Sequence, residues 1–271
     1  MPKGIMADTM EKNQKNRPLL IAGPCIIESS ELAHQIAKEV QAIAEKFGMH
    51  PIFKGSYQKA NRTSHGSFTG IGRKEALEIL RSVRDTGMQV ITDVHETTDV
   101  TEVADYVTHL QVPAFLCRQT DLILKCSDSG LPTNIKKGQF LSPEACKFVA
   151  DKFRSGKGKE VWMCERGFSF GYNDLIVDAT CIPRIKEAAQ CPVILDCTHS
   201  LQKPNRSNGT SGGNPDLVGT LAKFAFATGA DGLFIEVHPN PKSSASDSES
   251  ILELGKLEQV IEAAMRIYNA S

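Results

Sequence analysis

The stretch Met49-His50-Pro51-Ile52-Phe53-Lys54-Gly55-Ser56-Tyr57-Gln58-Lys59-Ala60-Asn61-Arg62-Thr63-Ser64 joins a short apolar run to a basic, hydroxyl-rich loop. The apolar run, residues 49–53, predicts a short buried strand. The loop that follows carries fixed positive charge on lysine and arginine, and its hydroxyls and amide add hydrogen-bond donors. Such a set suits a phosphate or a carboxylate better than a neutral ligand. A solvated surface loop could have the same composition, so the rest of the chain has to decide between the two interpretations.

The same pattern of a short apolar run ending in polar residues recurs along the whole chain. The other runs cover residues 19–22, 90–94, 110–115, 133–135, 160–164, 193–196 and 232–236. Helical patterns lie between them: Ser29 or Ser30 is a plausible N-cap for a first helix, and further helices are predicted over 74–85 and 254–267. Gly87 fits the end of the helix over 74–85.

Eight strand-then-helix units in one chain predict a closed (β/α)8 barrel of the α/β class, that is, a single-domain TIM barrel. The strands are continuous apolar runs, as expected for parallel strands that are buried on both faces. An open doubly wound sheet is the alternative, but the turn after the first strand, residues 22–25, is no dinucleotide-binding fingerprint. We interpret residues 1–17 as a polar N-terminal arm and 18–271 as the barrel catalytic domain.

Composition excludes several classes of partner. The chain has 271 residues, and its 31 Lys and Arg against 32 Asp and Glu give a net charge of −1. We therefore expect no global attraction to nucleic acid or to an anionic membrane, and no apolar run is long enough to span a bilayer. The N-terminal residues contain no apolar core of a secretory signal. The eight cysteines form no CxxC pair, which favours reduced thiols and a cytoplasmic location.

Polar residues that could bind an anion, a metal or a proton end nearly every predicted strand. Because the carboxyl ends of barrel strands meet at one rim, we expect these side chains to converge there. They are Cys25, Lys54 with Lys59, Asp93, Arg118, Lys136, Arg166, His199 and Glu236. Polar loops explain some of these positions, but they poorly explain five cations at one mouth, which would repel each other without bound anions. The expected ligand is anionic and carries more than one acidic group.

A second set of residues could bind a metal ion. Thiolate, imidazole and carboxylate together suit a borderline divalent ion such as Zn, Fe, Co or Mn. The set is Cys25, His199, Glu236 and Asp247. Each residue also has an ordinary structural interpretation: a packed thiol, a hydrogen-bonded histidine, a carboxylate paired with a cation, and a solvated or helix-capping aspartate.

Five ordered motifs resemble the 3-deoxy-D-manno-octulosonate 8-phosphate synthase family, from about Leu19 to near the C-terminus. They are residues 22–29 (AGPCIIES), 59–64 (KANRTS), 113–121 (PAFLCRQTD), 134–140 (NIKKGQF) and 211–213 (SGG). The related 3-deoxy-heptulosonate 7-phosphate synthases share the barrel and the phosphoenolpyruvate site. They typically carry Lys-Pro-Arg-Thr where this chain has KANR, so that stretch separates the two families. The chain departs from the pattern of the family it resembles at Thr63, where serine is usual, but the hydroxyl is kept.

The resemblance implies a transferase that condenses phosphoenolpyruvate, D-arabinose 5-phosphate and water into 3-deoxy-D-manno-octulosonate 8-phosphate and phosphate. It also implies the Kdo pathway to lipopolysaccharide, the cytoplasm and a homotetramer. By position, the residues that match the family's phosphoenolpyruvate contacts are Lys54, Ser56, Lys59, Gln111, Ala114, Lys136 and Arg166. Those that match the sugar-phosphate contacts are Asn61, Arg62, Thr63 and Ser211, and Arg118 is similar to a residue that reaches a neighbouring subunit's site.

The resemblance further implies the metal-dependent branch of the family, because Cys25 stands where the metal-independent branch has asparagine. His199, Glu236 and Asp247 would complete the ligand set for a divalent ion of unassigned identity. Catalytic roles are expected for Lys59, Lys136, Arg166, His199 and Asp93, with Lys59 the candidate for proton transfer because neighbouring cations should depress its pKa. Two alternatives stay open: a related enzyme that uses erythrose 4-phosphate, and a barrel that binds a sugar phosphate without turnover.

Overall fold

The computed structural model describes residues 17–60, 68–171, 175–203, 212–246 and 249–271. Eight parallel strands close into a barrel in sequence order, because β1 pairs with β2 on one side and with β8 on the other. The strands are β1 (Leu19–Gly23), β2 (His50–Lys54), β3 (Gln89–Asp93), β4 (His109–Val112), β5 (Thr133–Lys136), β6 (Val161–Glu165), β7 (Val193–Asp196) and β8 (Gly232–His238). The predicted TIM barrel is therefore confirmed, and the open sheet is excluded.

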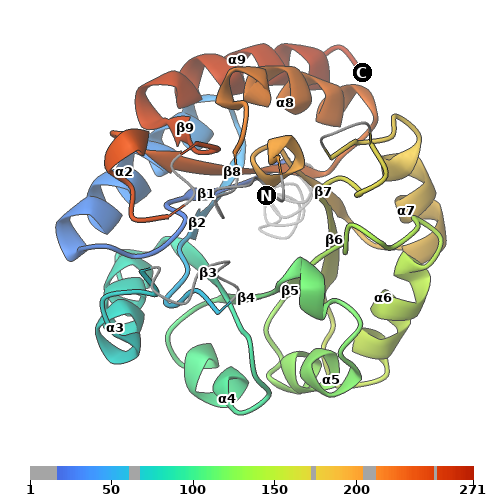
Figure 1. Ribbon diagram of the computed structural model, residues 1–271, viewed down its shortest axis with the longest axis horizontal. Helices are drawn as coiled ribbons and strands as arrows, with labels where there is room; N and C mark the ends of the chain where they lie inside the picture. Colours follow the sequence, from blue (N-terminus) through green and yellow to red (C-terminus); the bar gives the residue numbers. More distant parts are fainter. Residues whose placement is uncertain (1–16, 61–67, 172–174, 204–211, 247–248) are drawn as a thin grey trace, which may run out of the picture.

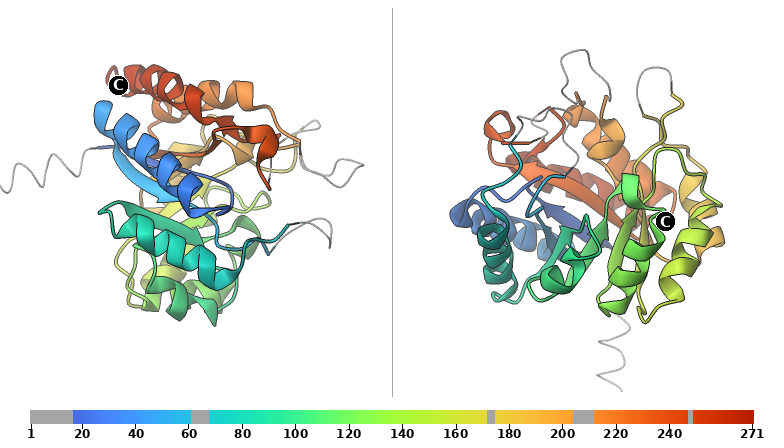
Figure 2. Two further views of the ribbon diagram at one scale, coloured as in Figure 1. Left: turned by 90° about the vertical axis from the view of Figure 1, so that its left-hand side faces the viewer. Right: turned by 60° about the horizontal axis from the view of Figure 1, so that its bottom comes forward.

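Helices surround the strands on the outside, as Figures 1 and 2 show from three directions. The α-helices are α2 (Ser30–Lys46), α3 (Arg73–Arg84), α4 (Asp99–Ala104), α5 (Thr120–Asp128), α6 (Cys146–Arg154), α7 (Cys181–Ala189), α8 (Val218–Ala227) and α9 (Leu257–Tyr268). Of the two predicted N-cap candidates, Ser29 caps α2, since its side chain accepts a hydrogen bond from the backbone N–H of Leu32, and Ser30 is the first residue of the helix. Among the described residues, no helix combines the length and the hydropathy needed to cross a membrane.

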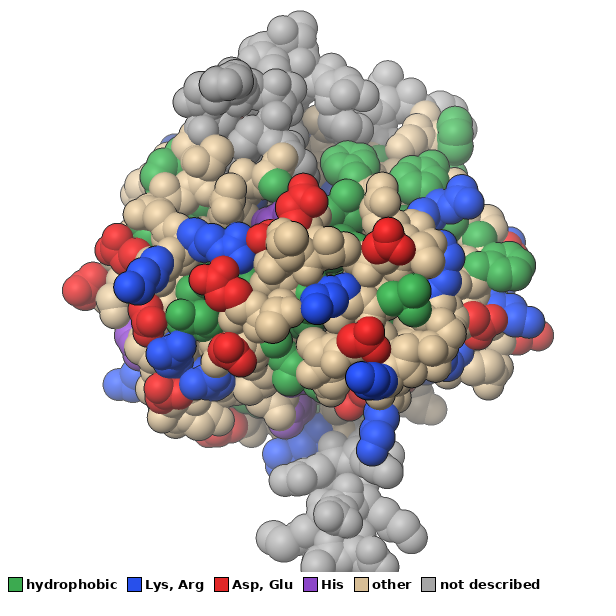
Figure 3. Space-filling view, turned by 90° about the horizontal axis from the view of Figure 1, so that it is seen from below, with side chains coloured by type: hydrophobic (Ala, Val, Ile, Leu, Met, Phe, Trp, Pro, Cys, Tyr) green, Lys and Arg blue, Asp and Glu red, His purple; other side chains and the backbone are tan. Residues whose placement is uncertain are grey.

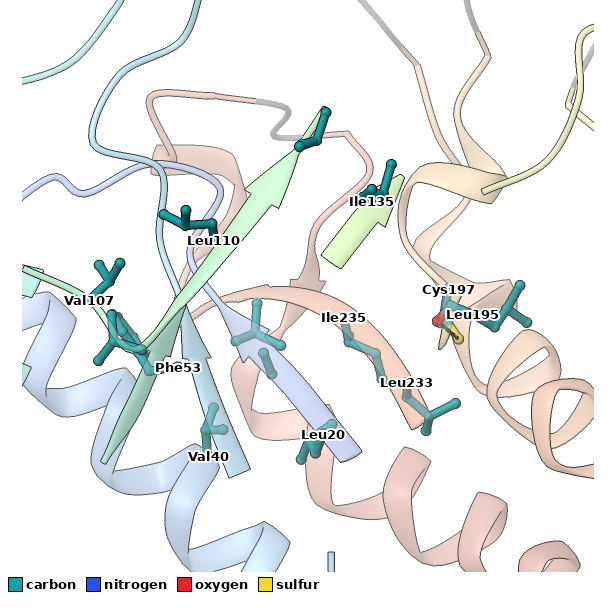
Figure 4. Close-up of a cluster of buried hydrophobic side chains, with 14 of the residues drawn as sticks. Leu20, Val40, Phe53, Val107, Leu110, Ile135, Leu195, Cys197, Leu233 and Ile235 are labelled. Carbon is teal, nitrogen blue, oxygen red and sulfur yellow. Dashed lines mark hydrogen bonds between the residues drawn. The ribbon is translucent and has the colours of Figure 1, made fainter. Parts of the chain in front are cut away.

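Two separate apolar clusters hold the barrel together. The larger one fills the space between the strands and the helices, and Figure 4 shows part of it, with Leu20 and Phe53 from strands and Val40 from α2. The smaller one fills the barrel interior and includes Ile91, Trp162 and Phe234. Continuous burial of the strands on both faces explains why their sequences show no alternation of apolar and polar residues. The interior cluster fills the barrel directly below the carboxyl ends of the strands, and we call it the apolar floor of the barrel mouth.

Three local details differ from the sequence prediction. The fourth strand ends at Val112 and not at residue 115, because Pro113 has no N–H to donate to a ladder. A 3-10 turn, η1 (Ala114–Leu116), follows and leaves Phe115 61% exposed. A short ninth strand, β9 (Leu252–Glu253), adds to the end of β8 in parallel and was not predicted. Helix α3 ends with Asp85 as its C-cap, two residues before the predicted Gly87.

Candidate active site

Buried charged side chains lie directly above the apolar floor, at the carboxyl ends of the strands. The inner-face positions are Lys54 on β2, Asp93 on β3, Gln111 on β4, Lys136 on β5, Asp196 on β7 and Glu236 on β8, all at most 6% exposed. The Phe234 ring lies under both lysines: its centroid is 3.1 Å from the Lys136 ammonium and 5.7 Å from that of Lys54. An aromatic face attracts a cation, so this ring stabilises positive charge at the mouth.

Lys54 joins three strands at one side of the mouth. Its ammonium donates to Glu236 Oε1 at 2.7 Å and to the backbone carbonyl of Cys25 at 2.9 Å. This contact needs a close approach of β1 to β2, because a Cβ on Gly23 would lie 1.9 Å from the Lys54 carbonyl oxygen. Glycine at position 23 therefore brings Cys25 next to Lys54 and Glu236.

Asp196 organises the opposite side of the mouth. Its Oδ2 accepts from Lys136 Nζ at 2.5 Å and lies 2.8 Å from His199 Nδ1, and its Oδ1 accepts from the backbone N–H of Thr198 and of His199. Burial alone would raise the pKa of Asp196, but His199 and Lys136 together hold that pKa well below its usual range. A fixed negative charge therefore lies between these two side chains.

Asp93 is the centre of a third group. Ser56 Oγ donates to its Oδ2 at 2.5 Å, Lys59 Nζ donates to Ser56 Oγ at 2.9 Å, and Gln111 Nε2 donates to the other carboxylate oxygen. Burial would raise the pKa of Asp93, but the charges of Lys54 and Lys59 keep it well below its ordinary value. Asp93 is therefore ionised, and it orients Ser56 and through it Lys59.

Arg166 follows β6 and is 6% exposed. Its Nη2 donates to Gln202 Oε1 at 2.8 Å and, at 3.4 Å, to the backbone carbonyl of His199. The guanidinium thus lies beside His199, with Lys136 on the neighbouring strand β5. Lys54, Lys59, Lys136 and Arg166 together supply the cluster of cations that the sequence predicts. Arg118 does not share their burial, since it lies exposed after η1.

Three of the four predicted metal ligands come from adjoining segments. His199 Nε2 lies 3.6 Å from Glu236 Oε2, and the fully buried Cys25 lies two residues after β1, which pairs with β8. The Cys25 thiol donates to Ser246 Oγ at 3.0 Å. Across the described parts of the chain, no three His, Cys, Asp or Glu side chains are grouped closely enough to bind a metal by themselves. The donor chemistry of imidazole, carboxylate and thiol suits a borderline divalent ion.

Several predicted residues lie outside the residues that the structure describes. They are Asn61, Arg62, Thr63, Ser211 and Asp247. Their expected roles remain predictions from the sequence. Ala114 is described, and it lies half-buried at the start of η1.

Sequence reasoning missed Asp196 and Asn134. Asp196 ends its strand three residues before His199, so the strand-end rule that selected the other residues could have found it. Asn134 lies two residues below Lys136 on the inner face, where only the strand register shows its contact: its Nδ2 donates to Gln111 Oε1 at 2.9 Å.

Comparisons with known proteins place this chain in a family. Residues 5–268 match the family model described as the DAHP synthetase I family. A 2-dehydro-3-deoxyphosphooctonate aldolase of Xanthomonas oryzae pv. oryzae (strain PXO99A) is 46% identical over 254 residues, which cover 93% of this chain and 92% of the relative. Relatives of the same name from Bordetella petrii and Acidithiobacillus ferrooxidans are 46% and 45% identical, and the matches cover 92% of this chain and 89% and 88% of those proteins. The chain therefore belongs to the DAHP synthetase I family, and within it to the 2-dehydro-3-deoxyphosphooctonate aldolases.

Proposed function

We propose that this chain is a 3-deoxy-8-phosphooctulonate synthase, which condenses phosphoenolpyruvate with D-arabinose 5-phosphate and water. The products are 3-deoxy-D-manno-octulosonate 8-phosphate and inorganic phosphate, and the reaction belongs to the Kdo branch of lipopolysaccharide synthesis. The observation that carries the proposal is the convergence of Lys54, Lys136 and Arg166 on one barrel mouth. Three buried cations at one site suit a substrate that carries both a phosphate and a carboxylate.

In the proposed reaction, C3 of phosphoenolpyruvate bonds to the aldehyde carbon of the sugar, and the aldehyde oxygen takes a proton. Water adds to C2, which has become electron-poor. The bond between C2 and its bridging oxygen then breaks, so that phosphate leaves with that oxygen and C2 becomes a ketone. The protein's main contribution is to hold C3 and the aldehyde carbon close together and to neutralise the anionic groups.

Lys59 is our candidate for the proton transfer. Its ammonium donates to Ser56 Oγ, which donates in turn to the buried carboxylate of Asp93, so this partly buried lysine is oriented by a hydrogen-bonded network. Lys136 and Arg166 hold the phosphoenolpyruvate, and His199 and Asp93 border the place where the aldehyde reacts. Asn61, Arg62, Thr63 and Ser211 bind the sugar phosphate in this proposal, as the family resemblance implies.

A divalent ion of Zn, Fe, Mn or Co is part of the proposal, with Cys25, His199, Glu236 and Asp247 as its ligands. The 3.6 Å separation of His199 Nε2 and Glu236 Oε2, next to the end of β1, supports it. When bound, such an ion supplies Lewis acidity or lowers the pKa of a water. The chain's own residues bind and orient the two substrates.

A second candidate activity has one observation in its favour, which is the description of the matching family model. An enzyme of that kind would use erythrose 4-phosphate as the aldehyde. The curated relatives favour the five-carbon sugar, since those cited here are named phosphooctonate aldolases.

The test is phosphate release from phosphoenolpyruvate with each sugar phosphate in turn, with and without chelator and added divalent ions. We expect release with D-arabinose 5-phosphate and an eight-carbon product by mass spectrometry. Phosphoenolpyruvate labelled with ¹⁸O at the bridging position should deliver its label to the phosphate. Release with erythrose 4-phosphate alone would support the second candidate, and release with neither sugar would indicate a binding protein.

A homotetramer in the cytoplasm completes the proposal. Phe115, Phe140 and Phe170 are 61%, 53% and 83% exposed on the loops after β4, β5 and β6. Such exposed apolar side chains favour contact with another copy of the chain. All eight cysteines are free thiols, which suits a reducing compartment. Figure 3 shows acidic and basic side chains interspersed on one face, without a single-sign patch that would favour nucleic acid. Light scattering tests the tetramer, and cell fractionation tests the location.

A further inference from the structure

A continuous series of hydrogen-bonded side chains crosses the mouth from the loop after β2 to β5. It runs from Lys59 through Ser56, Asp93 and Gln111 to Asn134. Its last three members lie side by side on the inner face, because Asp93 pairs in register with Gln111 and Gln111 with Asn134. The series therefore follows from the barrel register and not from flexible contacts.

The charge on Asp93 decides which way each amide points. An ionised carboxylate only accepts hydrogen bonds, so Gln111 must turn its NH2 group toward Asp93. That orientation leaves Gln111 Oε1 facing β5, where a buried oxygen requires a donor. Asn134 Nδ2 is that donor, at 2.9 Å. If Gln111 turned over, its oxygen would face the carboxylate, and the two acceptors would repel each other.

Asn134 is placed to orient other side chains and not to contact a substrate. It is fully buried, lies two residues below Lys136, and pairs in register with Trp162 in the apolar floor. Within the described part of the chain, its Oδ1 has no hydrogen-bond partner, so its bond to Gln111 sets the orientation of its amide. A side chain so placed acts on the reaction through Gln111, to which it donates its hydrogen bond.

We propose that Asn134 is a positioning residue that fixes the amide orientation of Gln111 and thereby the placement of Asp93 and Ser56 under the substrate. The inference rests on the proposed synthase activity. No other described side chain donates to Gln111 Oε1. Asn134 thus acts on Lys59 across three intermediate side chains.

The test exchanges the donor for an acceptor of the same shape with Asn134→Asp. A protonated carboxyl can donate to Gln111 Oε1, whereas an ionised one cannot, and burial raises the pKa of such a carboxyl. We expect the ratio of variant to wild-type kcat to fall at least about tenfold at high pH. The ratio should recover in acid, with the pH dependence of a single proton binding to the introduced carboxyl group. Thr133→Val, a buried hydroxyl loss on the opposite face of β5, should leave the ratio near one at every pH. A ratio for Asn134→Asp that is independent of pH would overturn the proposal.

Asn134→Leu keeps the test decisive if the aspartate variant does not fold. It removes the donor without adding charge, so kcat should fall about tenfold at all pH values. Wild-type kcat in folded Asn134→Leu would refute the positioning role. Absence of phosphate release by the wild type would count against the proposed function instead. A thermal double-mutant cycle of Asn134→Leu with Gln111→Met then tests the network without substrate, and zero coupling would refute it.

Discussion

Replacing Asp196 by asparagine should damage both the stability and the activity of the barrel. The aspartate is fully buried and accepts from two backbone N–H groups on Oδ1 and from Lys136 on Oδ2, where His199 Nδ1 also lies within hydrogen-bond distance. Asparagine has one acceptor oxygen and one NH2 group. If the oxygen keeps the two backbone bonds, the NH2 group faces the Lys136 ammonium, and two donors meet.

The size of the effect follows from the burial of the pair. The Lys136 side chain is 6% exposed and Asp196 is 0% exposed, and removing one partner of such a pair costs about 3–5 kcal/mol because a buried charge is left uncompensated. For a chain of this length that loss corresponds to a fall in Tm of about 10 °C. Since Lys136 also loses its fixed position, we expect kcat/KM for phosphoenolpyruvate to fall at least about a hundredfold.

The assay is thermal unfolding at a series of pH values, together with phosphate release. The folded-state pKa of Asp196 lies below its ordinary value, so its contribution to stability is full above about pH 4 and is lost as the pH falls further. The difference in Tm between wild type and Asp196→Asn should therefore be constant near neutrality and shrink in acid. Glu258→Gln, which breaks an exposed pair with Lys46, is the control and should change little. A neutral-pH Tm within about 2 °C of wild type would refute the reasoning.

Three further predictions concern other parts of the molecule. Cys25→Ser should lower the metal content of purified protein in elemental analysis, because a hydroxyl is a poorer ligand than a thiolate for borderline ions; unchanged content would remove Cys25 from the ligand set. Asp99→Asn should lower the free energy of unfolding in urea by about 1–2 kcal/mol, because Asp99 accepts from both Tyr57 (3.1 Å) and Arg73 (2.6 Å); an unchanged urea midpoint would contradict this. Burial, with a smaller contribution from a neighbouring histidine, lowers the pKa of His109 to about 4. The free energy of unfolding of the wild type should therefore fall by about 3 kcal/mol as the pH falls from 6.5 to 4. His109→Phe should lose less stability over the same pH range, and an equal loss would contradict the assignment.

The sequence predicted the barrel because its signal is local and repeated. Each buried strand needs a continuous apolar run, and each crossover needs a helix, so eight units could be read one at a time. The prediction was wrong at the fourth strand, where apolar residues continue past Pro113 although the strand cannot. It also missed β9, since two residues carry no periodicity.

The candidate site was predicted less completely for a different reason. The strand-end rule found Lys54, Lys136 and Glu236, because each closes a recognisable strand. It could not find which carboxylate pairs with which lysine, or that Asn134 lies against Gln111, since those contacts depend on register between strands far apart in the sequence. Arg118 also follows a predicted strand, but it lies after the 3-10 turn η1 and is exposed at the surface.

The two buried lysines of the mouth already have fixed partners, and this determines how an anion can bind there. Lys54 contacts Glu236 at 2.7 Å, and Lys136 contacts Asp196 at 2.5 Å. These carboxylates compensate the positive charge of the two buried ammonium groups, which would be costly to bury without a partner. They also compete with an incoming phosphate or carboxylate for the same N–H donors. We therefore expect a substrate with two anionic groups to bind more tightly than one with a single anionic group, because it can contact both lysines.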